Sequence, residues 1–414
     1  MSGGLKAFVI AAALAALAAT TGATLSAYSS TSGNAGSTFA TAATYSTCPN
    51  TTITPTYLTG WESGRKGAHA DVFVGFGSAA GSTVQSTVVR SGAYALKSSP
   101  AGAAAYMGWF SQALPASTTV RFALRFETLP TANVQELFAA RATGSAILRY
   151  VAASQTLTFA LAGTATVTSA SSVALVEDQW YVIDLKYDPS AATQQLAWSL
   201  DGVAQPSVST AGTVSGISEF QFGTKVADTY NAYFDDVMLT SSASHYPLGD
   251  GRVYALAPDG MGDLTAAGTS LVNDDGFALN ASSWQRLDES PLSTFTDYIA
   301  QTVQNTNYAE ITFANTTETC IRAAAGYITF HTLTSRVSNA KFLVYDGTTP
   351  STIRDGTFTH TTGRDTAKPI TPATTWSQSA LNGLTGRFGF WSGGQSNSPS
   401  PLLDGALIEY EVPQ

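Results

Sequence analysis

The residues best suited to chemistry lie a little past the middle of the chain, in the acidic stretch 230–263, YNAYFDDVMLTSSASHYPLGDGRVYALAPDGMGD. Paired carboxylates could be the acid and base of a glycosidase, which needs them about 5 Å or 6.5–9.5 Å apart, or could bind a cation. Their spacing favours neither, because Asp235 and Asp236 follow a predicted strand, Asp250 falls at a junction and Asp259 in a turn. We interpret the stretch as a seam between two domains that could hold an ion.

Other catalytic patterns are missing from the sequence. The E-x-D-x-x-E pattern, which places acid and nucleophile on one face of a strand, does not occur, and the side chains of Glu177-Asp178 and Asp288-Glu289 would point to opposite faces of a strand. There is no GxSxG motif and no phosphate loop. Four histidines are scattered without a metal-binding spacing: His69, His245, His331 and His360. The sequence therefore predicts a protein that is not an enzyme.

The composition indicates a surface or extracellular protein. Of 414 residues, 44% are hydrophobic but only 12% are charged, about half the usual share of charged residues. Ser, Thr, Ala and Gly fill the difference, as they often do in secreted proteins and on virion surfaces. The net charge is −9 and no run of Lys or Arg occurs, which excludes nucleic-acid binding.

From Tyr57 onward, the hydrophobic pattern has the two-residue period of β-strands. In VRFALRF, residues 120–126, the apolar side chains share one face while Arg121 and Arg125 share the other. Asp201-Gly202 supplies a turn that tolerates positive φ. The clearest strands of this series are 120–126, 157–161, 180–187 and 196–200. Many short strands with turn signals between them predict sandwiches or jelly rolls.

A second strand series follows the acidic stretch, and its clearest members are YITFHTL, KFLVYDG, GRFGFW and ALIEYEV. In the last of these, Ile408 and Tyr410 are predicted to face inward, and Glu409 and Glu411 to form a solvated outer face. The fold class is therefore all-β, with two tandem sandwich or jelly-roll domains after an N-terminal apolar helix. The predicted boundaries are 1–27 for the leader, 28–56 for an extended segment, 57–242 for the first domain and 243–414 for the second.

The order of motifs in the first domain resembles the laminin-G/concanavalin-like jelly rolls. GWESG opens it, VVRSGAYALKSS and EDQWYVIDLKYDPSAATQQLAWSLDGV follow, and YFDDVML closes it. The resemblance covers roughly residues 57–242. It implies a binding or structural module more often than an enzyme.

In such jelly rolls the first and last strands are often neighbours, which bears on Asp235. Strand parity aims its carboxylate at the apolar face, where unpaired burial is costly. Two solutions are open: hydrogen bonds from backbone N–H groups of a neighbouring loop, or a structural calcium ion shared with Glu62 of WESG. Asp236 is predicted to face solvent. No other cofactor is predicted.

The region from Asp235 to the C-terminus resembles structural proteins of tailed phages, in which a similar strand follows a concanavalin-like domain. LGDGRVYALAPDGMGD, SSWQRLDESP and the closing LLDGALIEYEV carry this resemblance. It implies a tail or receptor-facing component of a virion. The N-terminus departs from that pattern, because a virion protein should have no secretion signal.

The N-terminus has the layout of a secretory signal peptide. Lys6 precedes an apolar run over residues 7–19, and small polar residues end at Ala27, the predicted cleavage position. A retained anchor and a structural helix are the alternatives, although a membrane span needs about 20 apolar residues. The following AYSSTSGNAGSTFATAA resembles the first strand of biofilm-fibre proteins of the TasA/camelysin kind.

The chain has two cysteines, Cys48 and Cys320. In an exported protein they could form a disulfide that ties the N-terminal segment to the C-terminal half. The alternative is that both are small buried hydrophobic residues. Neither has the spacing of a zinc site.

Two functions follow. The first is a non-enzymatic subunit of an extracellular surface filament or virion appendage, whose N-terminal segment pairs with an open sheet edge of another copy. The second is a glycan-binding adhesin or receptor-binding module, with Trp109 and Trp391 as stacking residues. The alternative role for both tryptophans is core packing. The protein is expected to be secreted or on the cell surface, or else part of a virion.

Overall fold

A computed structural model describes most of the chain after residue 51. The described residues are 52–65, 73–114, 117–141, 145–163, 165–189, 193–211, 217–264, 267–268, 271–289, 297–301, 307–332, 338–347, 350–358, 364–372, 375–389 and 401–414. The predicted leader, Ala27, Cys48 and Trp391 lie outside these ranges. None of the described helices is both long enough and apolar enough to span a membrane.

Two facing antiparallel sheets form the first sandwich. The first has the order β13-β12-β11-β6-β16-β4-β3, with β1 added beside β16 and β14 beside β12. Its strands are β1 (Tyr57–Thr59), β3 (Ser82–Gln85), β4 (Ala95–Ser98), β6 (Thr118–Thr128), β11 (Trp180–Asp188), β12 (Thr193–Leu200), β13 (Val203–Ala204), β14 (Val208–Ala211) and β16 (Asn231–Thr240). The second has the order β10-β9-β8-β7-β15-β5-β2. Its strands are β2 (Phe73–Ser78), β5 (Ala101–Leu114), β7 (Val134–Arg141), β8 (Ser145–Val151), β9 (Thr156–Ala162), β10 (Thr166–Ala170) and β15 (Ile217–Thr229).

The core of this sandwich is aromatic. The apolar side chains of β6 point into it, and Phe122 stacks on Phe138 with ring centroids 4.9 Å apart. Burying one such side chain contributes about 1.5–3 kcal/mol, so alternating apolar residues fix which face of the strand turns inward. Between β12 and β13, Asp201 and Gly202 both have positive φ, +48° and +74°, which confirms the predicted turn.

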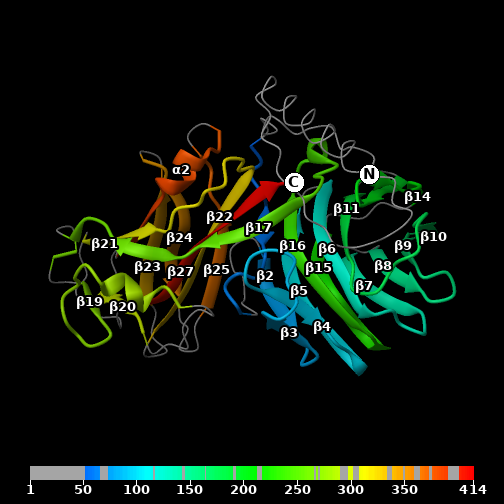
Figure 1. Ribbon diagram of the computed structural model, residues 1–414, viewed down its shortest axis with the longest axis horizontal. Coiled ribbons are helices and arrows are strands. Elements are labelled where there is room, and N and C mark those ends of the chain that lie inside the picture. Colours follow the sequence, from blue (N-terminus) through cyan, green and yellow to red (C-terminus); the bar gives the residue numbers. More distant parts are fainter. Residues whose placement is uncertain are drawn as a thin grey trace, which may run out of the picture. The chain divides into compact units, whose positions relative to one another are not determined.

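Two further antiparallel sheets form the second sandwich. One has the order β19-β20-β27-β22-β25, with β17 also paired to β27, and the other is β18-β21-β26-β23-β24. The strands are β17 (Gly251–Leu256), β18 (Pro258–Met261), β19 (Leu271–Asn273), β20 (Ile299–Gln301), β21 (Tyr308–Phe313), β22 (Ala323–Thr332), β23 (Ser338–Tyr345), β24 (Pro350–Phe358), β25 (Arg364–Pro369), β26 (Thr385–Gly389) and β27 (Pro401–Pro413). Figure 1 shows β27, in red, running between β17 and β22.

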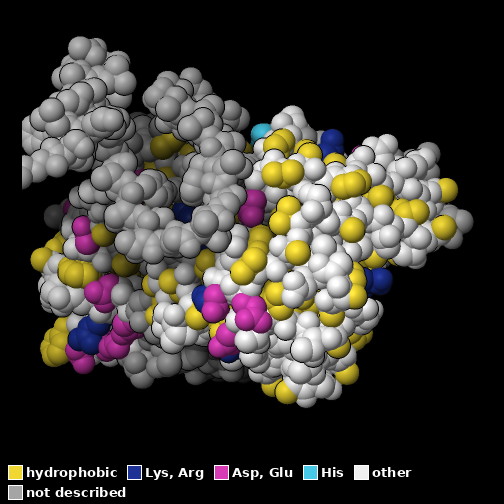
Figure 2. Space-filling view, turned by 45° about the vertical axis from the view of Figure 1, so that its right-hand side comes forward, with side chains coloured by type: hydrophobic (Ala, Val, Ile, Leu, Met, Phe, Trp, Pro, Cys, Tyr) yellow, Lys and Arg dark blue, Asp and Glu magenta, His cyan; other side chains and the backbone are white. Residues whose placement is uncertain are grey.

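The all-β class is confirmed, since helical structure in the described part of the chain is limited to short segments. These are η1 (Ala243–His245), η3 (Ser283–Arg286) and α2 (Gln378–Asn382). The second sandwich has its own core, into which Ile408 and Tyr410 point as predicted, together with Val412. On the face drawn in Figure 2, charged side chains form small separate groups among hydrophobic and uncharged polar atoms.

The two sandwiches share a packed boundary, which we call the seam. Residues 47–414 form one compact unit, and the outward-facing Tyr327, Ala367 and Leu407 of the second sandwich join the core cluster of the first. A separate apolar cluster lies beside them, formed by Ile53, Leu58, Met238, Leu248, Val253, Ala323 and Ala325. Ile53 also donates its N–H to the carbonyl of Arg322 at 2.9 Å. The segment before β1 is therefore built into the seam.

Candidate functional site: the seam and its cavity

An arginine–glutamate–arginine group joins the two sandwiches. Arg121 of β6 and Glu411 of β27 form an ion pair in which both side chains are 0% exposed. Arg322, just before β22, donates from Nε to Glu411 Oε2 at 2.8 Å and also pairs with Oε1. The two guanidinium groups hold the pKa of Glu411 below its usual value, against the opposing effect of burial. The carboxylate is therefore charged at neutral pH, and it is shared between the sandwiches.

A second group centres on Asp236, whose side chain accepts hydrogen bonds from the N–H of Val253 at 2.7 Å and from Arg90 Nη1 at 2.6 Å. Arg90 also pairs with Asp250. The prediction that Asp236 faces solvent is wrong, because this residue is 0% exposed. The pairing of β16 with β6 shifts register between Asp235 and Met238, and Asp236 has a φ of +54°. This bulge breaks the strand parity on which the prediction rested.

Asp235 is also fully buried. Its carboxylate accepts the backbone N–H groups of Arg90 and Asp236, both at 2.8 Å, which is the first of the two solutions open from the sequence. Burial, and then the charge of Asp236, raise its pKa well above the usual value, and Glu62 adds to this effect. In the described ranges, no three His, Cys, Asp or Glu side chains are arranged to hold a metal ion. The calcium site at Glu62 and Asp235 stays a prediction.

Two more carboxyl groups meet across the seam. The N–H of Glu62 donates to Glu409 Oε1 at 3.0 Å, and Thr59 Oγ1 donates to the same oxygen at 3.2 Å. Glu62 itself accepts the N–H of Ala93 at 2.7 Å. Burial is the main cause that raises the pKa of Glu62 to about 9 and that of Glu409 to about 8. Both groups are therefore protonated at neutral pH, and each could donate a proton.

The predicted solvated face of β27 is wrong, because Glu409 and Glu411 are 1% and 0% exposed. Strand alternation correctly separates them from the residues that fill the second core, but the first sandwich covers the other face. The same holds for Arg121, on the polar face of β6. The contacts link residues 290 to 350 positions apart in sequence, so no local spacing could have indicated them.

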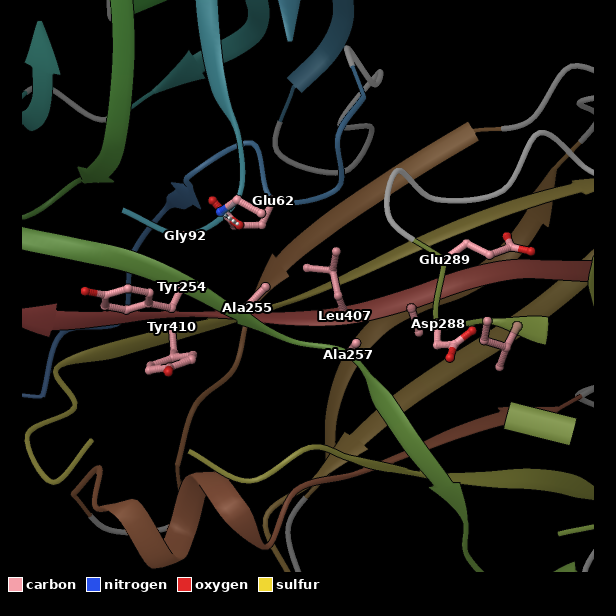
Figure 3. A pocket seen from close by; sticks show the side chains of 12 residues that line it. Glu62, Gly92, Tyr254, Ala255, Ala257, Asp288, Glu289, Leu407 and Tyr410 are labelled. Carbon is pink, nitrogen blue, oxygen red and sulfur yellow. Dashed lines mark hydrogen bonds between the residues drawn. The ribbon is translucent and has the colours of Figure 1, made fainter. Parts of the chain in front are cut away.

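A cavity of about 310 Å³ opens beside the seam. Glu62 and Gly92-Ala93 of the first sandwich line it, together with β17, β27 and residues 287–289 of the second. It lies where β17 leaves β27: β17 pairs with residues 408–413 and β20 with residues 402–403. In Figure 3, Tyr254 and Tyr410 lie on the side of Glu62, whereas Asp288 and Glu289 lie at the opposite end. Sequence reasoning missed this cavity.

The other predicted site residues are placed less fully. Cys320 is disulfide-bonded, and its predicted partner Cys48 lies outside the described residues. Trp109 lies in β5, paired with Phe220 of β15 and Phe76 of β2, but its side chain is outside what the structure describes. The glycan-binding role of Trp109 and Trp391 stays a prediction.

A buried histidine was also missed. His331, in β22, lies 2.8 Å from Asp404 Oδ2 of β27 and is buried with it. The two residues are 73 positions apart, so no motif spacing connects them. The sequence assigned neither a role.

Comparisons with known proteins give only distant similarities. No protein-family model matches the chain, and none of the curated proteins matches it. The solved structure of the cellulose-induced protein Cip1 is 17% identical, covering 45% of this chain and 97% of that one, with a TM-score of 0.34. A protein of unknown function with a galectin-like fold from Bacillus subtilis is 13% identical, covering 46% and 97%, with the same TM-score of 0.34. The endo-1,3-beta-glucanase from Streptomyces sioyaensis is 11% identical, covering 45% and 95%, with a TM-score of 0.31. Similarity at this level says nothing about activity or ligand.

Proposed function

We propose that the protein is a non-enzymatic structural module of an extracellular surface, a subunit of a filament or virion appendage that assembles through its N-terminal segment. The observation that supports this most is the seam. Buried ion pairs join the two sandwiches into one unit there, and the residues that form them are Arg121, Arg322, Glu411, Asp236 and Arg90. Such a unit suits a subunit that must keep its shape when neighbours bind it.

The residues just before β1 belong to this junction, which bears on how assembly would work. Residue 52 already contacts the second sandwich, because the N–H of Trp376 donates to Thr52 Oγ1 at 3.2 Å. Thr56 donates its N–H to the carbonyl of Leu239 at 2.7 Å. The donated strand is therefore expected within residues 28–46, before the seam, and it would pair with an open sheet edge of another copy.

The test compares chains that begin at residue 28 and at residue 47, examined by negative-stain electron microscopy. The shorter chain keeps Cys48 and every described seam contact. Filaments or rings from the longer chain alone would support strand donation, and a synthetic peptide of residues 28–46 should then inhibit them. If both chains stay monomeric at high concentration, the assembly function is refuted.

Glycan binding is the second candidate, and a second cavity favours it. This cavity, of about 340 Å³, lies on the outer face of β11 and β12 and is lined by hydrogen-bonding side chains that include Lys186, Asp188, Gln195, Ser207 and Ser209. Such groups are suited to sugar hydroxyls. A glycan array with the monomeric shorter chain separates this function from assembly.

A further inference from the structure

The cavity beside the seam has the chemistry of a binding site that is independent of the assembly function. Its volume of about 310 Å³ is at the lower end of the range for small-molecule pockets, about 300–1,000 Å³. Of the twelve described residues that line it, three carry carboxyl groups and none is Arg, Lys or His. The cavity therefore favours a positively charged ligand over an anion.

The carboxyl groups lie at the two ends of the cavity and the middle is apolar. Glu62 lies at one end and Asp288 and Glu289 at the other, and Leu407 and Ala257 lie between them (Figure 3). Tyr254 and Tyr410 lie near the Glu62 end, with ring centroids 5.8 Å apart. Aromatic rings beside carboxylates are the surroundings in which proteins hold ammonium groups.

One of the two carboxyl oxygens of Glu62 has no hydrogen-bond partner among the described residues. Its Oε1 atom is buried and accepts no hydrogen bond from the described residues, while Oε2 accepts the N–H of Ala93. Burial disfavours its ionised form most, and the neighbouring carboxyl groups of Glu409 on β27 and Asp236 on β16 add to this effect. Burial also raises the pKa of Asp288. Neither group forms an ion pair with a described residue, and a bound cation would supply the opposite charge.

We propose that this cavity binds a small aliphatic diamine, with one ammonium group directed to Glu62 and the other to Asp288 and Glu289. The methylene groups pack against Leu407 and Ala257. Binding converts Glu62 to its charged form, so a proton is released as the first ammonium group enters. A divalent metal ion fits less well, since within the described residues no group of three ligating side chains is arranged to hold one.

The test is isothermal titration calorimetry of the full chain with 1,5-diaminopentane, n-pentylamine, 1,5-pentanediol and calcium chloride. The diamine should bind at least tenfold more tightly than the monoamine, and the diol should not bind. Titrations at pH 7 in two buffers of different ionisation enthalpy should show uptake of a proton by the buffer. Equal binding of diol and diamine, binding of calcium in place of both amines, or no binding of any probe would overturn the proposal.

Variants locate the site. Glu62→Gln should weaken diamine binding about tenfold and abolish proton release, and Asp288→Asn should weaken binding while leaving proton release intact. Asp188→Asn changes a carboxyl group of the other cavity and should have no effect. If Glu62→Gln does not fold, Ala257→Trp still tests the site, because Ala257 is exposed and a large ring there would fill the cavity. Unchanged binding in Ala257→Trp would refute the location.

Discussion

Replacing Arg121 by Met tests whether the charged seam stabilises the fold. The change removes the ion pair with Glu411 and the two hydrogen bonds, both 3.2 Å long, that Nε and Nη2 donate to the carbonyl of Asp236. Glu411 keeps its pairing with Arg322, whereas the Asp236 carbonyl loses two donors. The variant therefore leaves the buried Glu411 carboxylate with only one of its two guanidinium partners.

The structure also provides a matched control. Arg125 lies four residues along on the same strand face, and its partner Asp178 has a side chain that is 64% exposed. Removing one member of a buried ion pair costs about 3–5 kcal/mol of unfolding free energy. Removing an exposed pair costs about 0–1 kcal/mol. We expect Arg121→Met to be destabilising by at least about 2 kcal/mol more than Arg125→Met.

Urea unfolding measures this difference, with circular dichroism for the whole chain and tryptophan fluorescence as a second probe. Trp61 and Trp198 are buried in the first sandwich, and Trp376 in the second. If the seam couples the sandwiches, Arg121→Met should also broaden the transition or split it into two. Equal destabilisation by both variants, with a single transition, would refute the reasoning.

Two further predictions concern the carboxyl groups of the seam. Because the folded pKa values of Glu62 and Glu409 are raised to about 9 and about 8, the native state binds more protons than the unfolded state between about pH 4.5 and 9. The unfolding free energy should therefore fall as pH rises through this window, by at most about 1.4 kcal/mol per pH unit for each group; urea titrations should show a shallower slope for Glu409→Gln and an unchanged one for Glu127→Gln. The second prediction is that Gly92→Ala lowers the unfolding free energy by at least about 2 kcal/mol more than Gly102→Ala does in the same assay. Both glycines have positive φ, but an added Cβ would lie 2.2 Å from Glu62 Oε1 at Gly92 and meets nothing within 4 Å at Gly102. Equal costs would mean that the Glu62 carboxyl moves freely.

The sequence was sufficient to predict the all-β class and the main strands. Residues 120–126 lie within β6 and residues 406–412 within β27, because alternating apolar residues leave a strand only one way to bury them. The turn at Asp201-Gly202 followed from local conformational preference. These predictions succeeded because their causes lie within a few residues of each other.

The seam could not be predicted in the same way. The alternation of apolar and polar residues predicts which side chains of a strand face the core of its own domain. It does not predict whether another domain covers the opposite face. Glu411 was therefore predicted to be solvated but is buried. Arg121, on the polar face of β6, is buried as well, and the bulge at Asp236 turns that side chain away from solvent. Only the composition could have indicated these buried ion pairs. In a chain with 12% charged residues, charged side chains that recur on one face of a strand suggest that they form ion pairs.

The seam also bears on how the chain reaches its native state. Its contacts span separations of 290 residues for Arg121 with Glu411 and 350 for Thr59 with Glu409. Contacts so distant in sequence form slowly, because closing a long loop costs entropy before the contact is gained. Each sandwich would then fold with its future joining face still in water. Until the two sandwiches dock, a joining face that carries charged side chains stays hydrated. A purely apolar face would associate with other partly folded chains. Charged groups at this boundary can thus protect the protein from aggregation before they hold it together.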